Sequence, residues 1–257
     1  MLTREEYVGY CRRYNLVWKY LTSCSYESDS VIDSLCELRG YDREQPIWAT
    51  LKKYGFCYID QDLFDWSKIK GVDKDKDLGI STKDDKFLLT DRFIFPVKDM
   101  LGNIVALIGW KQGSERKYVT TPSRLFSKNC MFFGLEQLAS TGIGKPYVLV
   151  EGIFDSLSVR SLGLNCIAMM GISSSRYKNV MYSLFSKFLA IPDNDKEGRK
   201  VVNGDLWRLP SNSKYLKLVS SEIKDVDDLI KTYDGSEVKQ LLIDAQKEPD
   251  RVVEVKI

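Results

Sequence analysis

The chain has 257 residues, with 38 Lys and Arg against 36 Asp and Glu, so its formal net charge is +2. A chain of this length can form one or two domains with a substantial core. Hydrophobic residues make up 44% of it, and no apolar run is long enough to cross a bilayer, which excludes a membrane-spanning protein. The absence of histidine excludes a Ser-His-Asp triad, an imidazole base and histidine metal ligands.

The cysteines indicate the type of metal chemistry and the compartment. There are six of them, without a C-x-x-C pair, and without histidine they cannot form a usual zinc finger or ribbon. We therefore expect buried reduced thiols and no zinc. Residues 1–6 are polar and acidic, unlike the start of a secretory signal, so we expect a cytoplasmic protein.

Residues 1–86 are expected to form a helical N-terminal region and a linker. Thr3 and Glu6 have the spacing of a capping box, which predicts a first helix from there. Apolar residues recur at helical intervals over 31–38, and a third, short helix is predicted over 46–55. The charged, turn-rich stretch that follows these helices is typical of a solvated surface connection.

Residues 87–145 are expected to form a basic subdomain with a β-hairpin. Two apolar runs, 93–97 and 104–108, flank a turn at 99–103, which is typical of two paired strands. Lysines and arginines are frequent from here on: Arg92, Lys98, Lys111, Arg116, Lys117, Arg124 and Lys128. Positive charge of this kind suits a nucleic-acid backbone or a triphosphate.

Residues 146–232 alternate between predicted strands and helices. The strands are 147–150, 166–170, 188–191 and 215–219, and the helices are 154–162, 177–184 and 197–209. This alternation predicts right-handed crossovers and a mainly parallel sheet flanked by helices, with ligands at the carboxyl ends of the strands. The remaining residues, 233–257, are expected to form a short helix and a tail.

Acidic residues fall at the expected strand ends. They are Glu151 and Asp155 after the first strand, Asp193 and Asp195 after the third, and Asp225 and Asp227 after the fourth. A parallel sheet brings these ends together, and clustered carboxylates repel one another unless a cation lies between them. Hard oxygen ligands suit Mg²⁺, which can activate an attacking oxygen and stabilise a phosphoryl transition state. Ordinary surface acids and helix caps are the alternative interpretation.

The same residues resemble a known family. The segment 150–155 (V-E-G-I-F-D), then Gly171, then 192–199 (P-D-N-D-K-E-G-R) resemble the three signatures of the toprim domain. This metal-binding fold is shared by topoisomerases and bacterial-type primases. The stretch 225–229 (D-V-D-D-L) is similar to a further acid pair of the primase branch, with Val226 where that family usually has proline.

The segment before these signatures also resembles the primases. Residues 91–99, with Gly102, resemble the hairpin of the primase RNA-polymerase core. The basic motif of that core is similar to residues 116–122, 126–128 and 133–136. The expected fold class is therefore α/β: a toprim core at 146–232 with a mainly parallel sheet flanked by helices, plus a basic α+β N-terminal subdomain.

The resemblance implies a DNA primase, which makes short RNA primers on a DNA template from ribonucleoside triphosphates by metal-dependent nucleotidyl transfer. Implied catalytic residues are Glu151, Asp193 and Asp195, and implied metal ligands are Glu151, Asp155, Asp193, Asp195, Asp225 and Asp227. Implied contacts to nucleic acid or nucleotide are Arg92, Lys111, Arg116, Lys117, Lys128 and Arg199. Whether Glu151 is a ligand or a base stays open, and Lys111 stands where the family usually has arginine, which loses a bidentate fork.

The implied cofactor is Mg²⁺, for which Mn²⁺ can substitute. The implied partners are a single-stranded DNA template and ribonucleoside triphosphates. No association with a membrane is expected. The usual zinc ribbon before the core and helicase domain after it are missing from the sequence, so a replicative helicase and a separate zinc-ribbon or template-recognition protein are candidate partners. Such a compact primase suits a phage or mobile element, which would place it in the host cytoplasm.

Other functions of the same residues remain open. A toprim nuclease would use the same acids and metal with water as the nucleophile, but the basic motif favours a primase. A catalytically inactive, primase-derived nucleic-acid-binding subunit is a second alternative, against which the intact set of acids argues. A topoisomerase would need gate domains and a positioned tyrosine that this length hardly accommodates.

Overall fold

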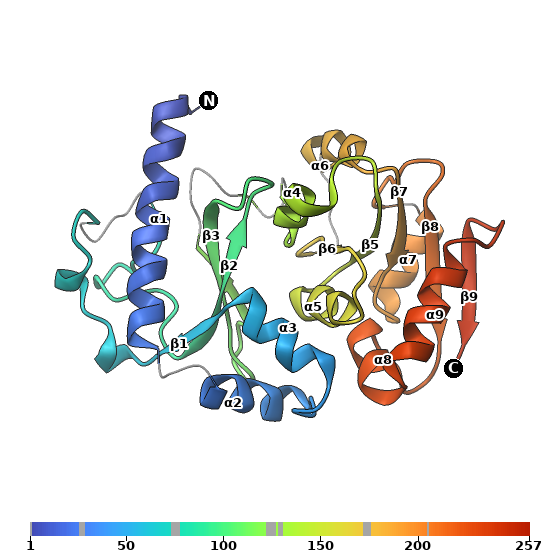
Figure 1. Cartoon of the computed structure of the whole chain (residues 1–257), viewed down its shortest axis with the longest axis horizontal. Coiled ribbons are helices and arrows are strands. Elements are labelled where there is room, and N and C mark those ends of the chain that lie inside the picture. Colours follow the sequence, from blue (N-terminus) through green and yellow to red (C-terminus); the bar gives the residue numbers. More distant parts are fainter. Residues whose placement is uncertain are drawn as a thin grey trace. The chain divides into compact units, whose positions relative to one another are not determined.

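The structure is a computed structural model that describes residues 2–25, 29–72, 78–121, 127, 131–171, 176–204 and 206–257. The chain divides into two compact units, Met1–Ser127 and Lys128–Ile257, and each is described by itself (Figure 1). Within the described residues, every helix is too short or too polar to cross a membrane.

The first unit begins with helices α1 (Arg4–Cys24), α2 (Asp29–Arg39) and α3 (Pro46–Tyr54). The expected capping box is present, since the Thr3 hydroxyl accepts the Glu6 N–H over 3.2 Å and the Glu6 carboxylate accepts the Thr3 N–H over 2.7 Å. Proline at the start of α3 removes one of the N–H groups that a helix start leaves without a helical partner, and Gly55 ends this helix with a φ of 81°. The three predicted helices are confirmed.

A four-stranded antiparallel sheet forms the rest of this unit, in the order β1 (Cys57–Ile59), β2 (Arg92–Lys98), β3 (Ile104–Trp110) and β4 (Tyr118–Thr120). Strands β2 and β3 form the predicted hairpin, and the Asp99 carboxylate accepts the N–H groups of Leu101 and Asn103 in its turn. Because β1 pairs with β2, residues on both sides of the boundary expected at 86/87 lie in one sheet.

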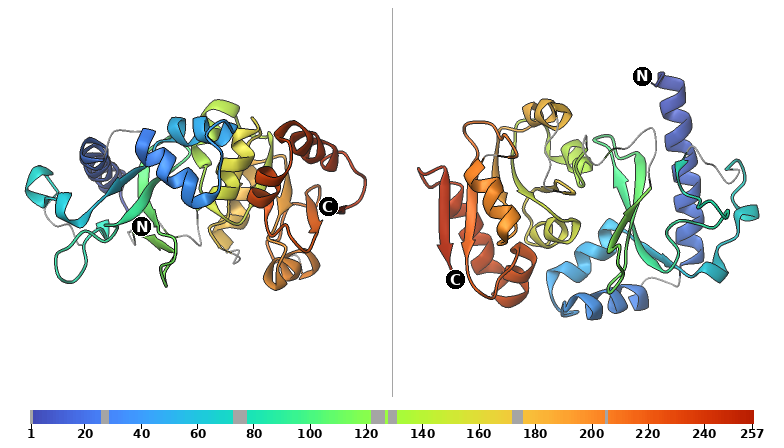
Figure 2. Two further views of the ribbon diagram at one scale, coloured as in Figure 1. Left: turned by 90° about the horizontal axis from the view of Figure 1, so that it is seen from below. Right: turned by 180° about the vertical axis from the view of Figure 1, so that it is seen from behind.

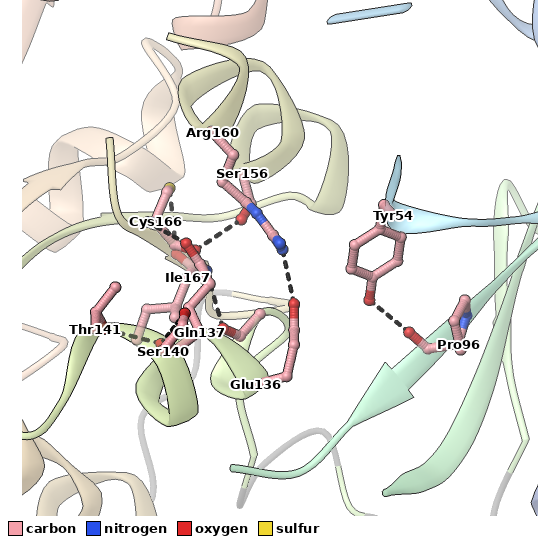
Figure 3. A network of polar contacts seen from close by, with 11 residues as sticks. Tyr54, Pro96, Glu136, Gln137, Ser140, Thr141, Ser156, Arg160, Cys166 and Ile167 are labelled. Atoms are coloured by element: carbon pink, nitrogen blue, oxygen red, sulfur yellow. Dashed lines mark hydrogen bonds and ion pairs between the residues drawn. The ribbon is translucent and has the colours of Figure 1, made fainter. Parts of the chain in front are cut away.

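The helices of the first unit cover this sheet. Helix α1 lies along it (Figures 1 and 2), where Tyr14 and Val17 share a core with Ile94 and Leu107. The Tyr54 hydroxyl at the end of α3 donates to the Pro96 carbonyl of β2 over 2.6 Å (Figure 3). Two single-turn 3₁₀ helices, η1 (Gln61–Leu63) and η2 (Trp66–Lys68), follow β1.

The second unit contains a five-stranded parallel sheet. Its strands in sheet order are β6 (Cys166–Ala168), β5 (Pro146–Val150), β7 (Lys187–Ile191), β8 (Lys214–Val219) and β9 (Val252–Lys256). Its helices are η4 (Leu135–Gln137), α4 (Leu138–Thr141), α5 (Ile153–Ser161), α6 (Arg176–Met181), η5 (Tyr182–Leu184), α7 (Lys196–Gly204), α8 (Val226–Thr232) and α9 (Gly235–Ala245). The predicted α/β fold with a parallel sheet flanked by helices is confirmed.

The segment that enters this sheet is fixed to its edge strand, β6. Phe133 and Ala168 exchange backbone hydrogen bonds of 3.0 and 2.9 Å. Gly134 has a φ of 95°, and a Cβ there would lie 2.9 Å from the Cys166 carbonyl oxygen, so this close approach requires glycine. In Figure 3, the Glu136 carboxylate reaches back to Arg160 of α5 over 2.9 Å. The segment 133–136, which resembles part of the primase basic motif, is therefore built into the sheet's edge.

Candidate functional site

The predicted acidic residues lie at the carboxyl ends of neighbouring strands in the second unit. Strands β5 and β7 are adjacent, with Val150 paired to Ile191, so Glu151 and Asp193 follow them at the same edge of the sheet (Figure 1). The Asp193 N–H donates to the Glu151 Oε1 over 3.3 Å. Parallel pairing thus brings the first two candidate ligands into contact.

The glycine of the E-G-x-x-D signature has a steric reason. A Cβ on Gly152 would lie 2.5 Å from the Asp155 Oδ2, which accepts the Gly152 N–H over 3.1 Å. The other oxygen, Oδ1, accepts the N–H of Asp227 at the start of α8 over 3.3 Å. Asp155 is 7% exposed. Its carboxylate therefore ties the start of α5 to the start of α8 inside the protein.

The D-x-D-x-x-G signature is explained in the same way. A Cβ on Gly198 would lie only 1.8 Å from the Asp193 carbonyl oxygen, so α7 can begin this close to β7 only with glycine there. The Asp195 Oδ1 accepts the N–H groups of Glu197 and Gly198 over 2.9 and 2.8 Å. These bonds satisfy the first turn of α7 and hold Asp195 beside Asp193, with its side chain exposed.

Acids of the third group surround the start of α8. Asp225 caps this helix by accepting the Asp228 N–H over 2.8 Å, and ligand oxygens of Asp225, Asp227 and Asp228 lie within 4.8 Å of one another. Asp227 is fully buried: its Oδ1 accepts the Ser158 hydroxyl, and its Oδ2 lies 3.2 Å from the Lys231 Nζ. The two oxygens of Asp227 therefore have protein partners.

These positions divide the predicted ligands into two groups. We call Glu151, Asp193, Asp195 and Asp225 the acidic rim. These four residues are partly or fully exposed, and they follow the carboxyl ends of the strands. We call Asp155 and Asp227 the buried acid pair.

Burial, and after it repulsion between neighbouring carboxylates, raises the pKa of several acids of this site. Burial and the neighbouring Asp193 raise the pKa of Glu151 from 4.5 to about 7. Burial and Asp225 raise the pKa of Asp193 from 3.8 to about 6, and burial also raises the pKa of Asp225. Burial, followed by Asp225 and Asp227, raises the pKa of Asp155 well above its ordinary value. Carboxylates packed at this density favour a bound cation, and hard oxygen donors suit a divalent one, so the rim residues fit such an ion.

Several residues of this site were missed in the sequence. The charge of Lys224 opposes the rise in the pKa of both Glu151 and Asp193, and the Lys224 carbonyl accepts the Asn194 N–H over 2.6 Å. Lys231, at i+4 from Asp227, is the cation closest to the buried acid pair that the described contacts include. The i+4 spacing of Lys231 could have indicated its role from the sequence, whereas Lys224 and Asn194 have their partners in a loop that follows a different strand.

Four of the predicted nucleic-acid contacts gather near the turn between β3 and β4 in the first unit. Lys111 and Lys117 flank this turn, where the Lys111 N–H donates to the Lys117 carbonyl over 3.0 Å. Their side chains and that of Arg116 are exposed. The Arg92 guanidinium donates to the Arg116 carbonyl over 2.9 Å and to the Ser114 hydroxyl over 3.3 Å. Arg92 therefore supports the segment that carries the exposed cations.

The other two predicted contacts lie elsewhere. Arg199 is exposed on α7 in the second unit, close in sequence to the acidic rim. Lys128 lies outside the described residues.

Comparison with known proteins supports the interpretation of this site. Residues 148–230 match the family described as Toprim-like. The DNA primase of Thermotoga maritima is 29% identical over 252 residues, which cover 92% of this chain and 43% of that protein. The DNA primase of Clostridium acetobutylicum is 25% identical over 181 residues, which cover 65% of this chain and 30% of that protein. The chain spans less than half the length of these two relatives.

Solved structures extend the likeness to both units. The DnaG primase catalytic domain bound to single-stranded DNA superposes with a TM-score of 0.69 at 17% identity, covering 91% of this chain and 80% of that one. The Aquifex aeolicus primase, solved with its zinc-binding and RNA polymerase domains, superposes with a TM-score of 0.72 at 22% identity, covering 95% and 62%. At such identities the likeness establishes the fold.

Residues 148–230 form a Toprim-like domain, and both units of the chain are similar to bacterial-type primases. The resemblance inferred from the signatures is confirmed, and the close approaches at Gly152 and Gly198 explain the glycines of two signatures. The toprim core carries an acidic cluster at the edge where such domains bind divalent metals.

Proposed function

We propose that this chain is the catalytic core of a DNA primase, a DNA-directed RNA polymerase that makes short primers. The observation that carries the proposal is the acidic rim at the strand ends of a toprim core whose likeness to primases covers both units. In the proposed reaction, the 3′-hydroxyl oxygen of one ribonucleotide bonds to the α-phosphorus of the next. The bond from that phosphorus to the β-phosphate oxygen breaks, and pyrophosphate leaves with its electron pair.

The rim residues Glu151, Asp193, Asp195 and Asp225 would hold the metal, which we propose is Mg²⁺, with Mn²⁺ as a substitute. When bound, such an ion supplies positive charge to the reacting phosphate and makes a hydroxyl a better nucleophile. Glu151 lies beside Asp193 at the end of β5, where it would either ligate the ion or accept the hydroxyl proton. The buried acid pair would hold α5 and α8 in place behind the rim, since its oxygens already accept protein donors.

The exposed cations at the β3–β4 turn would contact phosphate oxygens. Lys111, Arg116 and Lys117 project from one turn, which suits the regular spacing of charge on a template strand or a triphosphate. We propose the same role for Arg199 and Lys128, and a supporting role for Arg92, whose guanidinium is bonded to this turn.

A single-stranded DNA template and ribonucleoside triphosphates are the proposed substrates. One of the similar solved structures is a primase catalytic domain bound to single-stranded DNA, which supports the template by analogy. A replicative helicase, a separate zinc-ribbon or template-recognition protein, and a location in the cytoplasm remain predictions from the sequence.

The proposal is tested by incubating the protein with single-stranded DNA, labelled ribonucleotides and either Mg²⁺ or Mn²⁺. Oligoribonucleotides whose composition follows the template are expected, and the Asp193→Asn variant is the matched negative control. Degradation of the nucleic acid without synthesis would instead indicate a toprim nuclease. Binding of DNA without either reaction would indicate a subunit that has lost turnover.

A further inference from the structure

Asn194 lies between the two aspartates of the D-x-D signature, in the loop after β7, and it bonds to the loop that follows β8. Its side-chain Nδ2 donates to the Ser220 carbonyl over 2.8 Å and to the Ile223 carbonyl over 3.1 Å. Its backbone N–H donates to the Lys224 carbonyl over 2.6 Å. One residue thus joins the loop that follows β7 to the loop that follows β8.

The loop that receives these bonds is itself well defined. The Ser220 hydroxyl accepts the N–H groups of Glu222 and Ile223, both over 3.1 Å, which closes a tight turn. The Ile223 side chain is buried, and the loop ends at Asp225, the first residue of the third acid group. Asn194 therefore bonds to a compact turn, and this turn leads directly to the rim residue Asp225.

The sheet alone does not fix the distance between these acids. The pairing of β7 with β8 extends over Leu189 with Lys214 and Ala190 with Tyr215, and it ends before either strand reaches its acids. Beyond that point β8 pairs with β9 instead. The bonds from Asn194 join the two chain segments at the place where the ladder no longer holds them.

We propose that Asn194 is a positioning residue, which sets the spacing between Asp193 and Asp195 on one loop and Asp225 on the other so that all three can share one divalent ion. This inference rests on the proposed metal-dependent function of the rim. Like charges on the two loops repel, and Asp225 is the neighbouring charge that contributes most to the raised pKa of Asp193. Because Asn194 holds the loops together in the metal-free protein, ion binding does not have to supply the free energy that overcomes this repulsion.

The chemistry of the side chain fits this role. Only a primary amide of this length offers two N–H donors to the carbonyls of Ser220 and Ile223. Aspartate at 194 would face those carbonyls with acceptors and would add another negative charge between Asp193 and Asp195. Alanine would keep the backbone bond to Lys224 and lose both side-chain bonds.

The chain offers a matched control for this substitution. Asn212 lies just before β8, and its Nδ2 donates to the carbonyl of Ser186, just before β7, over 2.7 Å. It therefore makes the same kind of bond between the same two strands, at the end of the sheet that carries no rim acid. Asn194→Ala removes two partly buried bonds and Asn212→Ala removes one exposed bond of the same kind, at opposite ends of the sheet.

The test is calorimetric titration of the nucleotide-free protein with Mn²⁺ and Mg²⁺, together with melting in EDTA. We expect Asn194→Ala to weaken divalent-ion binding by about 10-fold or more, the range typical of groups that orient metal ligands. Asn212→Ala should bind the ion within about twofold of the original protein. Without metal it should lose less stability than Asn194→Ala, because it removes one exposed bond instead of two partly buried ones. In primer synthesis, Asn194→Ala should need a higher Mg²⁺ concentration for half-maximal rate and recover part of its rate at saturation.

Several results would overturn the proposal. Equal ion affinities for the two alanine variants would reduce Asn194 to a structural contact, and an original protein that binds no divalent ion would remove the basis altogether. If Asn194→Ala does not fold, Asn194→Ser, which keeps one donor, should weaken binding by about threefold, and unchanged affinity would count against the proposal. Ion binding is measured without synthesis, so the two proposals can fail separately. If the original protein and the variants bind the ion with the expected order of affinities but the protein makes no primers, the primase function is rejected and the role of Asn194 stands.

Discussion

The acidic rim and the buried acid pair come from the same strand ends, yet their carboxylates have different surroundings. Glu151 follows β5 directly and faces Asp193, whereas Asp155, one helical turn later, points inward and accepts backbone N–H groups from two helix starts. Asp225 caps α8 at the rim, whereas Asp227 is buried against Ser158 and Lys231. Acidic residues a few positions apart therefore have different roles. The rim carboxylates are accessible to an ion, whereas those of the buried pair bond to protein donors inside the fold.

This difference shows how a signature can combine chemistry with scaffolding. The E-G-x-x-D spacing carries one acid to the sheet edge and the other into the interior, where it joins α5 to α8. Bonds from backbone donors offset only part of the cost of burying that second carboxylate, because its pKa stays well above its ordinary value. Substitutions in the two groups should therefore fail in different ways.

The largest effect is expected in the rim. Asp193→Asn should reduce primer synthesis by at least about 1,000-fold, since it removes a charged ligand from a hard-cation site. Its melting temperature in EDTA should hold or rise, because the substitution relieves repulsion with Glu151 and Asp225. Synthesis assays and thermal melting of the same preparation measure both. Near-normal turnover by the folded variant would remove Asp193 from the site.

The next effect compares the two acids of one signature. Glu151→Gln should cost more turnover at saturating Mg²⁺ than Asp155→Asn, for which a loss of about 10- to 100-fold is expected from a group that orients others. Asp155→Asn should in turn lower the melting temperature more, because an amide at this position offers fewer acceptors to the N–H groups of Gly152 and Asp227. A larger loss of turnover for Asp155 would mean that the rim and the pair are reversed.

Much of this arrangement could be predicted from the sequence, and the rest depends on contacts that leave no local pattern. The parallel sheet and the gathering of acids at the carboxyl ends of its strands follow from alternating strands and helices, since each rim acid lies in the segment that follows a strand. The inward direction of Asp155 depends on how α5 packs against α8, and the role of Asn194 depends on carbonyls of another loop. The last strand, β9, was expected to be a tail because it is short and stands alone after α9.

A pH series should separate the groups without any substitution. The raised pKa of Glu151, about 7 against an ordinary 4.5, means that folded protein keeps this proton where the unfolded chain has lost it. Stability without metal should therefore fall as pH rises from about 4.5 to 7, by at most about 3.5 kcal/mol, since each pKa unit is worth about 1.4 kcal/mol. Asp193 contributes in the same direction. Denaturant unfolding in EDTA measures this slope.

The control for that series is the same titration in excess Mg²⁺ and in Glu151→Gln. Bound cations favour the ionised carboxylates, so Mg²⁺ should flatten the fall in stability, and Glu151→Gln should remove the part that comes from this residue. A stability in EDTA that stays constant between pH 5 and 8 would show that burial and neighbouring charges do not raise the pKa of the rim carboxylates.

The smallest expected effects come from the lysine beside each group. Lys224 is exposed next to the rim, whereas Lys231, with 20% of its side chain exposed, lies 3.2 Å from the Asp227 Oδ2. Lys224→Met should raise the KM for nucleotide by about fivefold, roughly 1 kcal/mol for a partly exposed ion contact, and leave stability unchanged. Lys231→Met should lower stability by about 1–3 kcal/mol, because it leaves the buried Asp227 carboxylate without its cation, and should leave KM unchanged. Steady-state kinetics and denaturant unfolding of both variants measure this contrast. If each variant changes both KM and stability, to a similar extent in the two variants, the rim and the buried pair act as one charge network.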